Sequence, residues 1–363
     1  MYFTCNRSAL TNSINIVQKA VSSRSTLPIL QGILLSVEQD KLILTGTDLE
    51  ITIRTEMEVK SSENLRFVVD SKLFGDIIRR LPDEEVTITL KENNLAEIRS
   101  GKARFKISVM NPEEFPETPK IENAFMISLE SDLVEDMIRK TIFSISKDDI
   151  RQVLKGGLLE FEDGLYLVTL DGYRMSIRFE KMEGLNRFKM IIPGKTLDEI
   201  LKIIDDTEGN INIGVSNNHA CFELGSTVIY SRLIEGEFIN YKQLIPSSYN
   251  TRIKINTRWF YDSLERASIV LREEKSNVVR FYINEGFLKI LGNTEVASVE
   301  EEVPIELFGD RMEIAFNPRY FMEALRVIDD EEIYIDFTTN LSPCVIRPLK
   351  GEKYIYIILP IRI

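Results

Sequence analysis

The sequence predicts an α+β fold made of three tandem copies of one domain, each with two helices packed on antiparallel sheets. A segment that reads as strand, amphipathic helix, acidic turn and strand occurs at 67–90, at 190–215 and at 314–337. A second apolar strand recurs with nearly the same offset, ending at Asp48, Asp171 and Asn293. Two independent segments that repeat together indicate duplication of a whole domain.

Within the first recurring segment, the helix carries apolar residues at positions i, i+3, i+4 and i+7, which lie on one helical face. The three sets are offset by 123 and 124 residues and comprise Phe74, Ile77, Ile78 and Leu81, then Leu197, Ile200, Leu201 and Ile204, then Phe321, Ala324, Leu325 and Ile328. Each helix is therefore expected to pack on a sheet by this face.

Each copy opens with a longer helical pattern, which brings the expected helices to six. They span 7–24, 70–81, 131–147, 193–204, 257–273 and 317–329. Connectors rich in Pro, Ser and Asn follow the first and second copies. The predicted domains are 1–122, 126–246 and 252–363.

Composition excludes several classes of protein. The chain of 363 residues lacks a signal-peptide pattern and an apolar run long enough for a membrane span, so we expect a cytoplasmic protein. Its three cysteines, Cys5, Cys221 and Cys344, form no CxxC pair, which argues against disulfides and against a zinc site. We expect no metal and no cofactor.

No nucleophile, P-loop, GxGxxG or HExxH motif indicates an enzyme. The acidic pairs Asp205 with Asp206 and Asp329 with Asp330 resemble metal or acid-base sites, but Asp83, Asp206 and Asp330 occupy the same turn of the repeat. Solvated turn carboxylates explain them better than a catalytic site does. The single histidine, His219, is expected in a surface loop.

A net charge of −12 weighs against a nucleic-acid partner if the charge is spread evenly. The six expected helices, however, hold 16 Lys and Arg against 12 Asp and Glu. Helices that share a face would then give an acidic protein one basic surface. Ordinary solvated helix charge is the alternative explanation.

Several stretches together resemble the beta sliding clamp of bacterial DNA polymerase III. They are STLPILQGILL, LTGTDLEITIR, NPEEFPETP, IRQVLKGGLLEFEDGLYLVTLDGYRMSIR, FNPRYFMEAL and the terminal ILPIRI, in the order of the family and over the whole chain. The resemblance implies a non-catalytic homodimer, joined head to tail into a ring of six domains with helices lining the hole. Such a ring encircles duplex DNA without sequence preference and tethers the replicative polymerase and other replication and repair proteins.

Two other functions remain open from sequence alone. One is a protein-interaction scaffold of the same fold that does not encircle DNA, and the other is a carboxylate-dependent enzyme acting on DNA. For the ring, the basic residues expected to face DNA are Arg7, Lys19, Arg24, Lys72, Arg79, Arg80, Arg139, Lys140, Lys147, Lys202, Arg266 and Arg326. The family places the loops of Arg24 and Lys147 near DNA.

The resemblance also implies an apolar cleft between the second and third domains that binds short peptides of the polymerase, the clamp loader and other partners. The matching residues are Leu154, Gly172, Tyr173, Arg174, Met175, Leu244, Asn317, Tyr320, Pro343, Ile346, Leu359, Pro360, Ile361 and Arg362. Arg174 or Arg362 is expected to orient the peptide. Tyr173 and Leu170 stand where the family often has His and Thr, and Ile239 and Gln243 where it often has Pro and Arg.

Ring closure is expected to join the outer edge of domain one to domain three of the other copy. The apolar residues that match the family's interface are Ile77, Leu81, Phe105, Ile107, Ile269 and Val270. Arg104 and Lys106 are expected to face the acidic run Glu300, Glu301 and Glu302.

Overall fold

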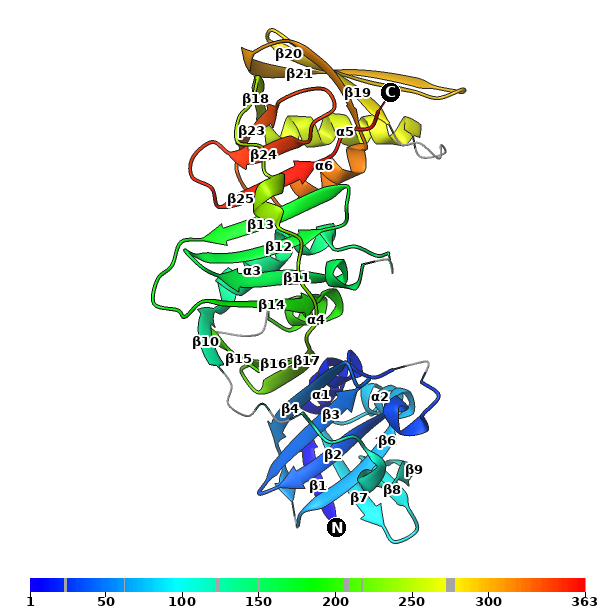
Figure 1. Cartoon of the computed structure of the whole chain (residues 1–363). Helices are drawn as coiled ribbons and strands as arrows, with labels where there is room; N and C mark the ends of the chain where they lie inside the picture. The colour runs from blue at the N-terminus through cyan, green and yellow to red at the C-terminus, as the bar shows by residue number, and fades with distance from the viewer. Residues whose placement is uncertain are drawn as a thin grey trace. The chain divides into compact units, whose positions relative to one another are not determined.

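The computed structural model describes residues 1–22, 25–61, 63–119, 121, 125–148, 151–204, 209–216, 218–271 and 278–362 (Figure 1). The described helices are α1 (Arg7–Gln18), α2 (Ser71–Arg79), α3 (Ser131–Arg139), α4 (Gly194–Ile204), α5 (Thr257–Leu271) and α6 (Pro318–Leu325). Short 3-10 turns are η1 (Pro28–Gln31), η2 (Pro112–Glu114), η3 (Ile142–Ser144), η4 (Gln152–Lys155) and η5 (Tyr241–Leu244).

The strands make up most of the regular structure and all pair antiparallel. In the first half of the chain they are β1 (Tyr2–Asn6), β2 (Gly32–Glu38), β3 (Lys41–Thr47), β4 (Ile51–Glu58), β5 (Lys60–Ser61), β6 (Leu65–Asp70), β7 (Glu85–Lys91), β8 (Leu95–Ser100), β9 (Ala103–Met110), β10 (Phe125–Glu130), β11 (Gly156–Phe161), β12 (Leu165–Leu170) and β13 (Arg174–Glu180). The others are β14 (Phe188–Pro193), β15 (Asn210–Val215), β16 (His219–Leu224), β17 (Thr227–Arg232), β18 (Thr251–Asn256), β19 (Val279–Asn284), β20 (Phe287–Asn293), β21 (Ser298–Gly309), β22 (Met312–Phe316), β23 (Glu332–Phe337), β24 (Cys344–Pro348) and β25 (Tyr354–Ile358).

Strand pairing crosses the boundaries of the sequence repeat. A 13-stranded sheet has the order β10-β15-β16-β17-β4-β3-β2-β6-β9-β8-β7-β1-β5, and a 12-stranded sheet has the order β14-β11-β12-β13-β25-β24-β23-β18-β21-β20-β19-β22. Strand β17 of the second repeat pairs with β4 of the first, and β25 of the third pairs with β13 of the second. The second repeat therefore contributes to both sheets.

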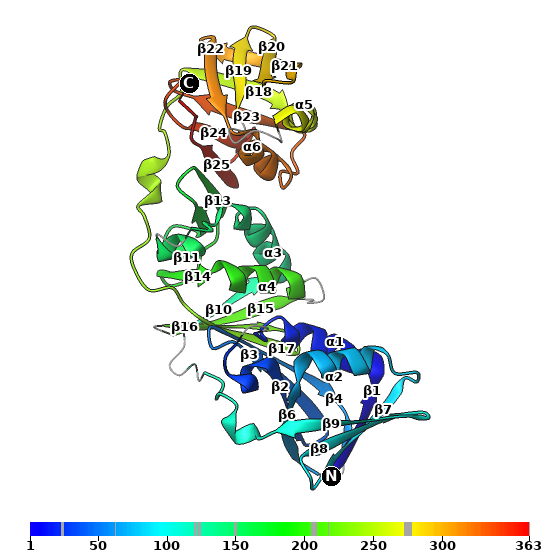
Figure 2. The same cartoon turned by 90° about the vertical axis from the view of Figure 1, so that its right-hand side faces the viewer.

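Two compact units follow from this pairing. Unit 1 contains residues Met1–Val134 and Glu199–Leu233, and unit 2 contains Glu135–Asp198 and Ile234–Ile363. In unit 1, helices α1 and α2 lie side by side on one face of the strands, and in unit 2 helices α5 and α6 do the same (Figure 2). No helix in the described ranges is long and apolar enough to cross a membrane.

Helices α1, α2, α3 and α6 are shorter than the periodicity predicts. The backbone N–H groups of Lys19 and Arg80 bond three residues back, to Ile16 and Ile77, which tightens the chain and ends α1 and α2. After α3, the hydroxyl of Thr141 donates to the carbonyl of Met137 at 2.7 Å, and a 3-10 turn follows.

This shortening makes the expectation of positively charged helices wrong. With the observed ends, the six helices hold equal numbers of basic and acidic side chains. Lys19, Arg80, Lys140 and Arg326 lie just past helix C-termini, where the helix dipole favours a cation without any nucleic acid.

The core of the third repeat is a cluster of phenylalanines between the helix pair and the sheet. Phe321 of α6 is fully buried and its ring centroid lies 5.6 Å from that of Phe260, 5.4 Å from Phe281 and 5.0 Å from Phe316, mostly edge to face. Edge-to-face contacts add to the free energy gained by burying each ring.

We predict that Phe321→Ala lowers the unfolding free energy of unit 2 by about 3–5 kcal/mol, because it leaves a cavity among three other rings. Trp259, the one tryptophan of the sequence, lies on α5 of this unit and reports the transition by fluorescence in urea. The matched control is Phe308→Ala, since Phe308 is 44% exposed; its loss is expected to stay below about 1 kcal/mol. Equal losses in both variants would contradict this prediction.

Candidate functional site

The acidic turn after α6 is held by partners within unit 2. Asp329 Oδ2 lies 3.0 Å from Lys140 Nζ and 3.2 Å from Arg139 Nη2. Asp330 accepts a hydrogen bond of 2.6 Å from the hydroxyl of Tyr354. These two carboxylates are structural, as the repeat indicates. Asp205 and Asp206 lie outside the described residues.

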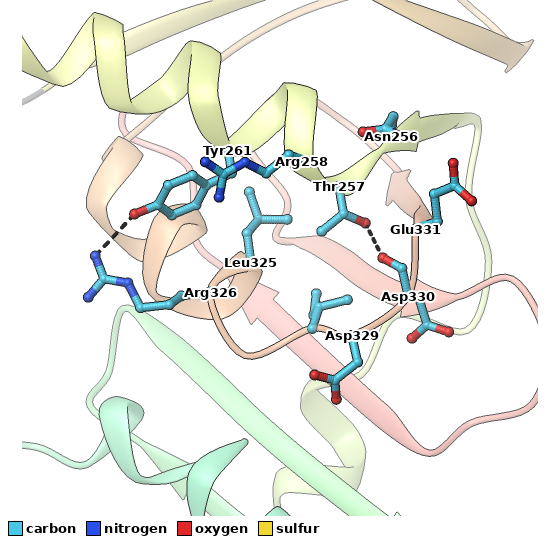
Figure 3. A pocket seen from close by; sticks show the side chains of 10 residues that line it. Asn256, Thr257, Arg258, Tyr261, Leu325, Arg326, Asp329, Asp330 and Glu331 are labelled. Atoms are coloured by element: carbon cyan, nitrogen blue, oxygen red, sulfur yellow. Dashed lines mark hydrogen bonds between the residues drawn. The ribbon is translucent and has the colours of Figure 1, made fainter.

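Figure 3 shows a polar pocket of about 480 Å³ beside this turn, at the N-terminus of α5. Arg326 donates to the hydroxyl of Tyr261 at 3.1 Å, and Thr257 donates to the carbonyl of Asp330 at 2.7 Å, so the two helices and the turn are cross-linked around it. Within the described ranges, no group of three or more His, Cys, Asp or Glu side chains is placed to hold a metal ion.

His219 does not lie in a loop but begins β16, half-buried, with Nδ1 2.9 Å from Asn218 Oδ1. The three cysteines are buried and free. Burial raises the pKa of the Cys5 thiol to about 12, so this side chain stays a neutral thiol at neutral pH. Neither residue type is arranged for nucleophilic chemistry.

Arg174, expected to orient a bound peptide, is instead occupied by its own neighbours. Its side chain is only 8% exposed, its Nε lies 3.0 Å from Asp171 Oδ2, its Nη1 pairs with Glu323, and its Nη2 donates to the carbonyl of Phe143. Its Cζ also lies 4.7 Å from the ring centroid of Tyr320. Arg174 thus joins the turn after β12 to helix α6.

Several residues of the predicted cleft lie together next to Arg174 and its partners. The rings of Tyr173 and Tyr320 stack with centroids 6.3 Å apart, and the backbone N–H of Leu359 donates to the carbonyl of Tyr173 at 2.9 Å. Tyr173 is 59% exposed and Leu359 is 39% exposed. The two tyrosines and the chain end therefore form an accessible aromatic and aliphatic surface.

The other cleft residues divide into core and surface. Leu154 and Met175 belong to one buried cluster with Leu170 and Ile357, and Ile346 belongs to another. Pro343, Pro360 and Ile361 are half-buried, Gly172, Leu244 and Arg362 are exposed, and Asn317 caps α6 by accepting from the N–H of Arg319. Leu154, Met175 and Ile346 are thus core residues, whereas the accessible part of the predicted cleft consists of the exposed and half-buried residues.

Most of the basic residues predicted to face DNA are ion-paired. Arg7 lies 2.5 Å from Glu84, Arg79 lies 3.1 Å from Asp76, and Lys202 lies 3.0 Å from Glu199. Arg266 donates to both oxygens of Glu301, at 2.8 and 2.6 Å. Arg139 and Lys140 share Asp136 and Asp329, and Lys19 donates to the carbonyl of Lys202 at 3.1 Å.

The remaining members of that set are more accessible. Lys72 and Lys147 are exposed, and Arg326 donates to the hydroxyl of Tyr261. Arg80 is exposed as well, although its Nη1 lies 3.5 Å from the Asp76 carboxylate and donates to the Asp76 carbonyl at 3.1 Å. Arg24 lies outside the described residues. The structure thus divides the predicted cations into a paired majority and a smaller accessible group.

Two strands carry the residues predicted for the dimer interface. Residues 103–108 of β9 pair with β8, and only Val109 and Met110 reach β6, so the second edge of 103–108 faces no strand in the described part of the chain. Likewise 298–304 of β21 pair with β20, and β18 pairs only from Ile305 onward. Each strand thus leaves more than half of one edge unpaired within the described part of the chain.

The comparisons with known proteins agree throughout. Models described as DNA polymerase III beta subunit, N-terminal, central and C-terminal domain, match residues 1–119, 128–240 and 242–362. The beta sliding clamp of Halalkalibacterium halodurans is 33% identical over 380 residues, with 100% of both chains covered. The chain belongs to the DNA polymerase III beta subunit family, the beta sliding clamps. A crystal structure of the sliding clamp from Bacillus subtilis has a TM-score of 0.97 at 32% identity and covers 100% of this chain and 99% of that one.

The resemblance found in the sequence is therefore confirmed, as is the α+β fold of three clamp domains with antiparallel sheets. The chain is a DNA polymerase processivity factor, a non-catalytic accessory subunit in DNA replication. The paired carboxylates of this clamp act in structure, which agrees with that role.

The sequence did not predict the residues that hold Arg174 beside Tyr173 and Tyr320, among them Asp171, Phe143 and Glu323. Only weak signals for them were present. Asp171 precedes Gly172 in a turn, where its Oδ1 accepts from the N–H groups of Tyr173 and Arg174. Glu323 stands four residues after Arg319, a spacing typical of a helical ion pair, and the two lie 2.8 Å apart.

The ion pairs at Asp329 predict a pH dependence for unit 2 of the clamp. Burial disfavours the charged form of Asp329, but hydrogen bonds from Lys140 and Arg139 outweigh it and lower its pKa. Burial also disfavours the charged form of Asp136, but hydrogen bonds from Lys140 and Arg178 outweigh this effect and lower its pKa. A folded pKa below the unfolded value of about 3.9 stabilises the fold above that value, and the gain disappears as pH falls through the folded pKa.

We expect Asp329→Asn to lower the unfolding free energy at pH 7 by up to about 1 kcal/mol, since water still reaches this pair. The difference from the unchanged protein should shrink below about pH 4, where the carboxyl of the unfolded chain begins to protonate, and should vanish as pH falls through the lower pKa of the folded state. Thermal unfolding followed by Trp259 fluorescence from pH 7 to 3 measures both. Glu285→Gln, on an exposed pair 3.5 Å from Arg311, is the control and should show no such change. A pH-independent difference would contradict this account.

Proposed function

We propose that two copies of this chain close head to tail into a ring around duplex DNA, with β9 of one copy beside β21 of the other. The observation that carries the proposal is the pair of open strand edges on these two strands. Domains 1–122, 126–246 and 252–363 are the building blocks that we propose for this ring. A closed ring that cannot fall off DNA would explain how a processivity factor works without tight binding.

Charge supports pairing of these edges. Alternate residues of a strand point to opposite faces, so Arg104 and Lys106 share one face of β9, and Glu300 and Glu302 share one face of β21. All four side chains are exposed. Within their own chain, Glu300 and Glu302 both contact Lys289, at 2.7 and 3.4 Å, so two carboxylates share one cation. Opposite charges facing each other across an antiparallel pair favour association.

Glu301 has a different role from its neighbours in the acidic run. It points to the other face of β21, where Arg266 of α5 binds it, and this bond, despite the opposing effect of burial, lowers its pKa. We therefore limit the proposed electrostatic contact to Glu300 and Glu302.

Apolar residues occupy the opposite faces of the same two edges. On β9 these are Phe105, 40% exposed, and Ile107, which is buried in its own chain. Ile77 of α2 is half-buried, and Leu81, two residues past α2, is buried. On the other side, α5 presents Ile269, 61% exposed, beside half-buried Val270. We propose that Phe105 and Ile269 form the apolar centre of the interface, supported by Ile77, Leu81, Ile107 and Val270.

For DNA, we infer weak, sequence-independent contact through the accessible cations. Among the residues that the structure describes, Lys72, Lys147 and Arg326 have no carboxylate within ion-pair distance, and Arg80 has only Asp76 at 3.5 Å, so a phosphate can replace solvent there with little competition. The paired set, Arg7, Lys19, Arg79, Arg139, Lys140, Lys202 and Arg266, would have to exchange an existing partner first. We expect that set to contribute less per residue.

We further propose that the surface around Tyr173, Tyr320 and Leu359 binds short linear peptides of the polymerase and other partners. Exposed aromatic and aliphatic side chains over a rigid base suit apolar anchor residues of such peptides. Arg174 stabilises this surface through its contacts within the chain. Arg362 is exposed near the chain end, and we propose that it binds a carboxylate of the peptide.

The second candidate is a scaffold of this fold that does not encircle DNA, and the net charge of −12 favours it. Topology separates the two functions. A ring loaded on closed circular DNA remains bound in moderate salt and is lost when the circle is cut, whereas a scaffold shows neither behaviour.

We predict that Glu300→Lys with Glu302→Lys shifts the dimer to monomer and removes retention on closed circular DNA, because like charges then face Arg104 and Lys106. Adding Arg104→Glu and Lys106→Glu in the same chain should restore both properties. Sedimentation and gel filtration of loaded circles measure mass and retention. Glu306→Lys lies on the part of β21 that pairs with β18 and is the control. An intact dimer in the double variant would remove the proposed interface.

For the peptide surface, we predict that Tyr173→Ala combined with Leu359→Asp weakens binding of a polymerase C-terminal peptide at least tenfold while the dimer stays intact. Both side chains are exposed, so the core is spared, unlike a change at Met175, which is 3% exposed. Fluorescence anisotropy of a labelled peptide measures the affinity. Leu341→Asp, at a residue 63% exposed in the same domain, is the control. Unchanged affinity would remove this assignment.

A further inference from the structure

A cluster of charges lies on the face of β18, β23 and β24 that points away from the core. Arg252 and Asp336 are direct partners across β18 and β23. Asp336 Oδ1 lies 2.5 Å from Arg252 Nε, and its Oδ2 lies 2.8 Å from Arg252 Nη2 and 3.0 Å from Arg347 Nε. The Asp336 side chain is 6% exposed. One buried carboxylate therefore holds two guanidinium groups.

The surrounding connector keeps this cluster in place. The connector that contains η5 passes on the side of the sheet away from α5 and α6 (Figure 2). Asn250 fixes it to β23 through hydrogen bonds from its backbone N–H to the carbonyl of Phe337 at 2.9 Å and from its Nδ2 to the carbonyl of Thr338 at 2.8 Å. Arg252 Cζ lies 4.0 Å from the ring centroid of Tyr249 and 4.6 Å from that of Tyr334. The arginine is therefore preorganised.

A cavity of about 100 Å³ opens beside the cluster, with polar walls from Ser247, Ser248, Arg252, Asp336, Thr338 and Arg347. At ~30 Å³ per water it has room for roughly three waters, or for one tetrahedral oxyanion. The Thr338 hydroxyl is already used, since it donates to the carbonyl of Ser248 at 3.1 Å.

The side-chain groups left in these walls can all donate hydrogen bonds. Arg347 Nε is buried and lies 3.0 Å from Asp336 Oδ2 without the geometry of a hydrogen bond, and Arg347 donates none to any residue that the structure describes. The hydroxyls of Ser247 and Ser248 make no hydrogen bond within the described part of the chain, and both Asp336 oxygens are already in contact with guanidinium nitrogens. Two guanidiniums against one carboxylate leave one uncompensated positive charge in a half-buried cavity, which favours an anion with several acceptor oxygens.

We propose that this cavity, which Val345 also lines, is a binding site for a phosphate group. Arg347 and Arg252 supply the charge, and the hydroxyls of Ser247 and Ser248 supply further donors. The phosphate has two possible sources, a free phosphate or nucleotide and a phosphorylated side chain of a partner. The exposed ring of Tyr249, 42% exposed, lies beside the cavity and would contact the remainder of either ligand.

Isothermal titration calorimetry of the full chain in phosphate-free buffer tests the site with inorganic phosphate, adenosine monophosphate and a phosphoserine peptide. We expect saturable binding of one phosphate per chain. Arg347→Gln should weaken it at least tenfold. Ser247→Asp places a carboxylate at the cavity without touching Asp336 and should abolish it. A tenfold gain for the nucleotide or for the peptide over inorganic phosphate identifies the source.

Arg311→Gln is the matched control, because Arg311 lies in the same domain, is 67% exposed and should leave phosphate binding unchanged. Thermal unfolding of each variant verifies folding. Absence of saturable phosphate binding by the unchanged chain overturns the proposal. So does equal affinity in the unchanged chain and the folded Ser247→Asp variant.

Discussion

Pairing of antiparallel strands at sheet edges is the interaction on which the rest of this clamp depends. Each repeat alone would leave an unpaired edge, which is a site for uncontrolled association. Pairing of β4 with β17 and of β13 with β25 removes two such edges inside the chain. The edges of β9 at 103–108 and of β21 at 298–304 remain. Besides the end strands of the two sheets, these two partly open edges thus remain, and in the proposed dimer they pair with each other.

The same backbone arrangement at the two internal junctions carries different side chains. Asp48 accepts from the N–H groups of Glu50 and Ile51 as Asp171 does from those of Tyr173 and Arg174. The N–H of Arg232 donates to the carbonyl of Glu50 at 2.9 Å as that of Leu359 does to Tyr173. Leu49 takes a positive φ of 78° where Gly172 has 93°, so the turn shape is kept although Leu is strained there. The hydrogen bonds thus keep the same turn at both junctions, whereas the exposed tyrosine pair is present only at the junction that contains Tyr173.

The sequence was sufficient for the repeat, the helix faces and the family, because these depend on local periodicity and on motifs. It was insufficient for the helix ends and for the partners of charged residues. Arg139 and Lys140 contact Asp329, which lies almost two hundred residues further along the chain. Arg266 of α5 contacts Glu301 of β21, and this contact depends on how the helix packs on the strand, which local sequence patterns do not show. The polar neighbours of His219 predict a loop, although the residues that follow it, Ala220, Cys221 and Phe222, are all buried in β16.

Internal ion pairing also explains how an acidic protein can act on DNA without holding it. Binding to duplex DNA gains free energy from the counterions that each phosphate contact releases, and the affinity rises steeply with the number of contacts. A cation already paired with a carboxylate, such as Arg7 with Glu84, gives up that contact when it meets a phosphate, so its net gain is small. In the ring that we propose, DNA-facing cations that are mostly paired in this way would bind weakly at every position. Closure of the proposed interface between copies would then retain the DNA, and weak contact would allow movement along the duplex.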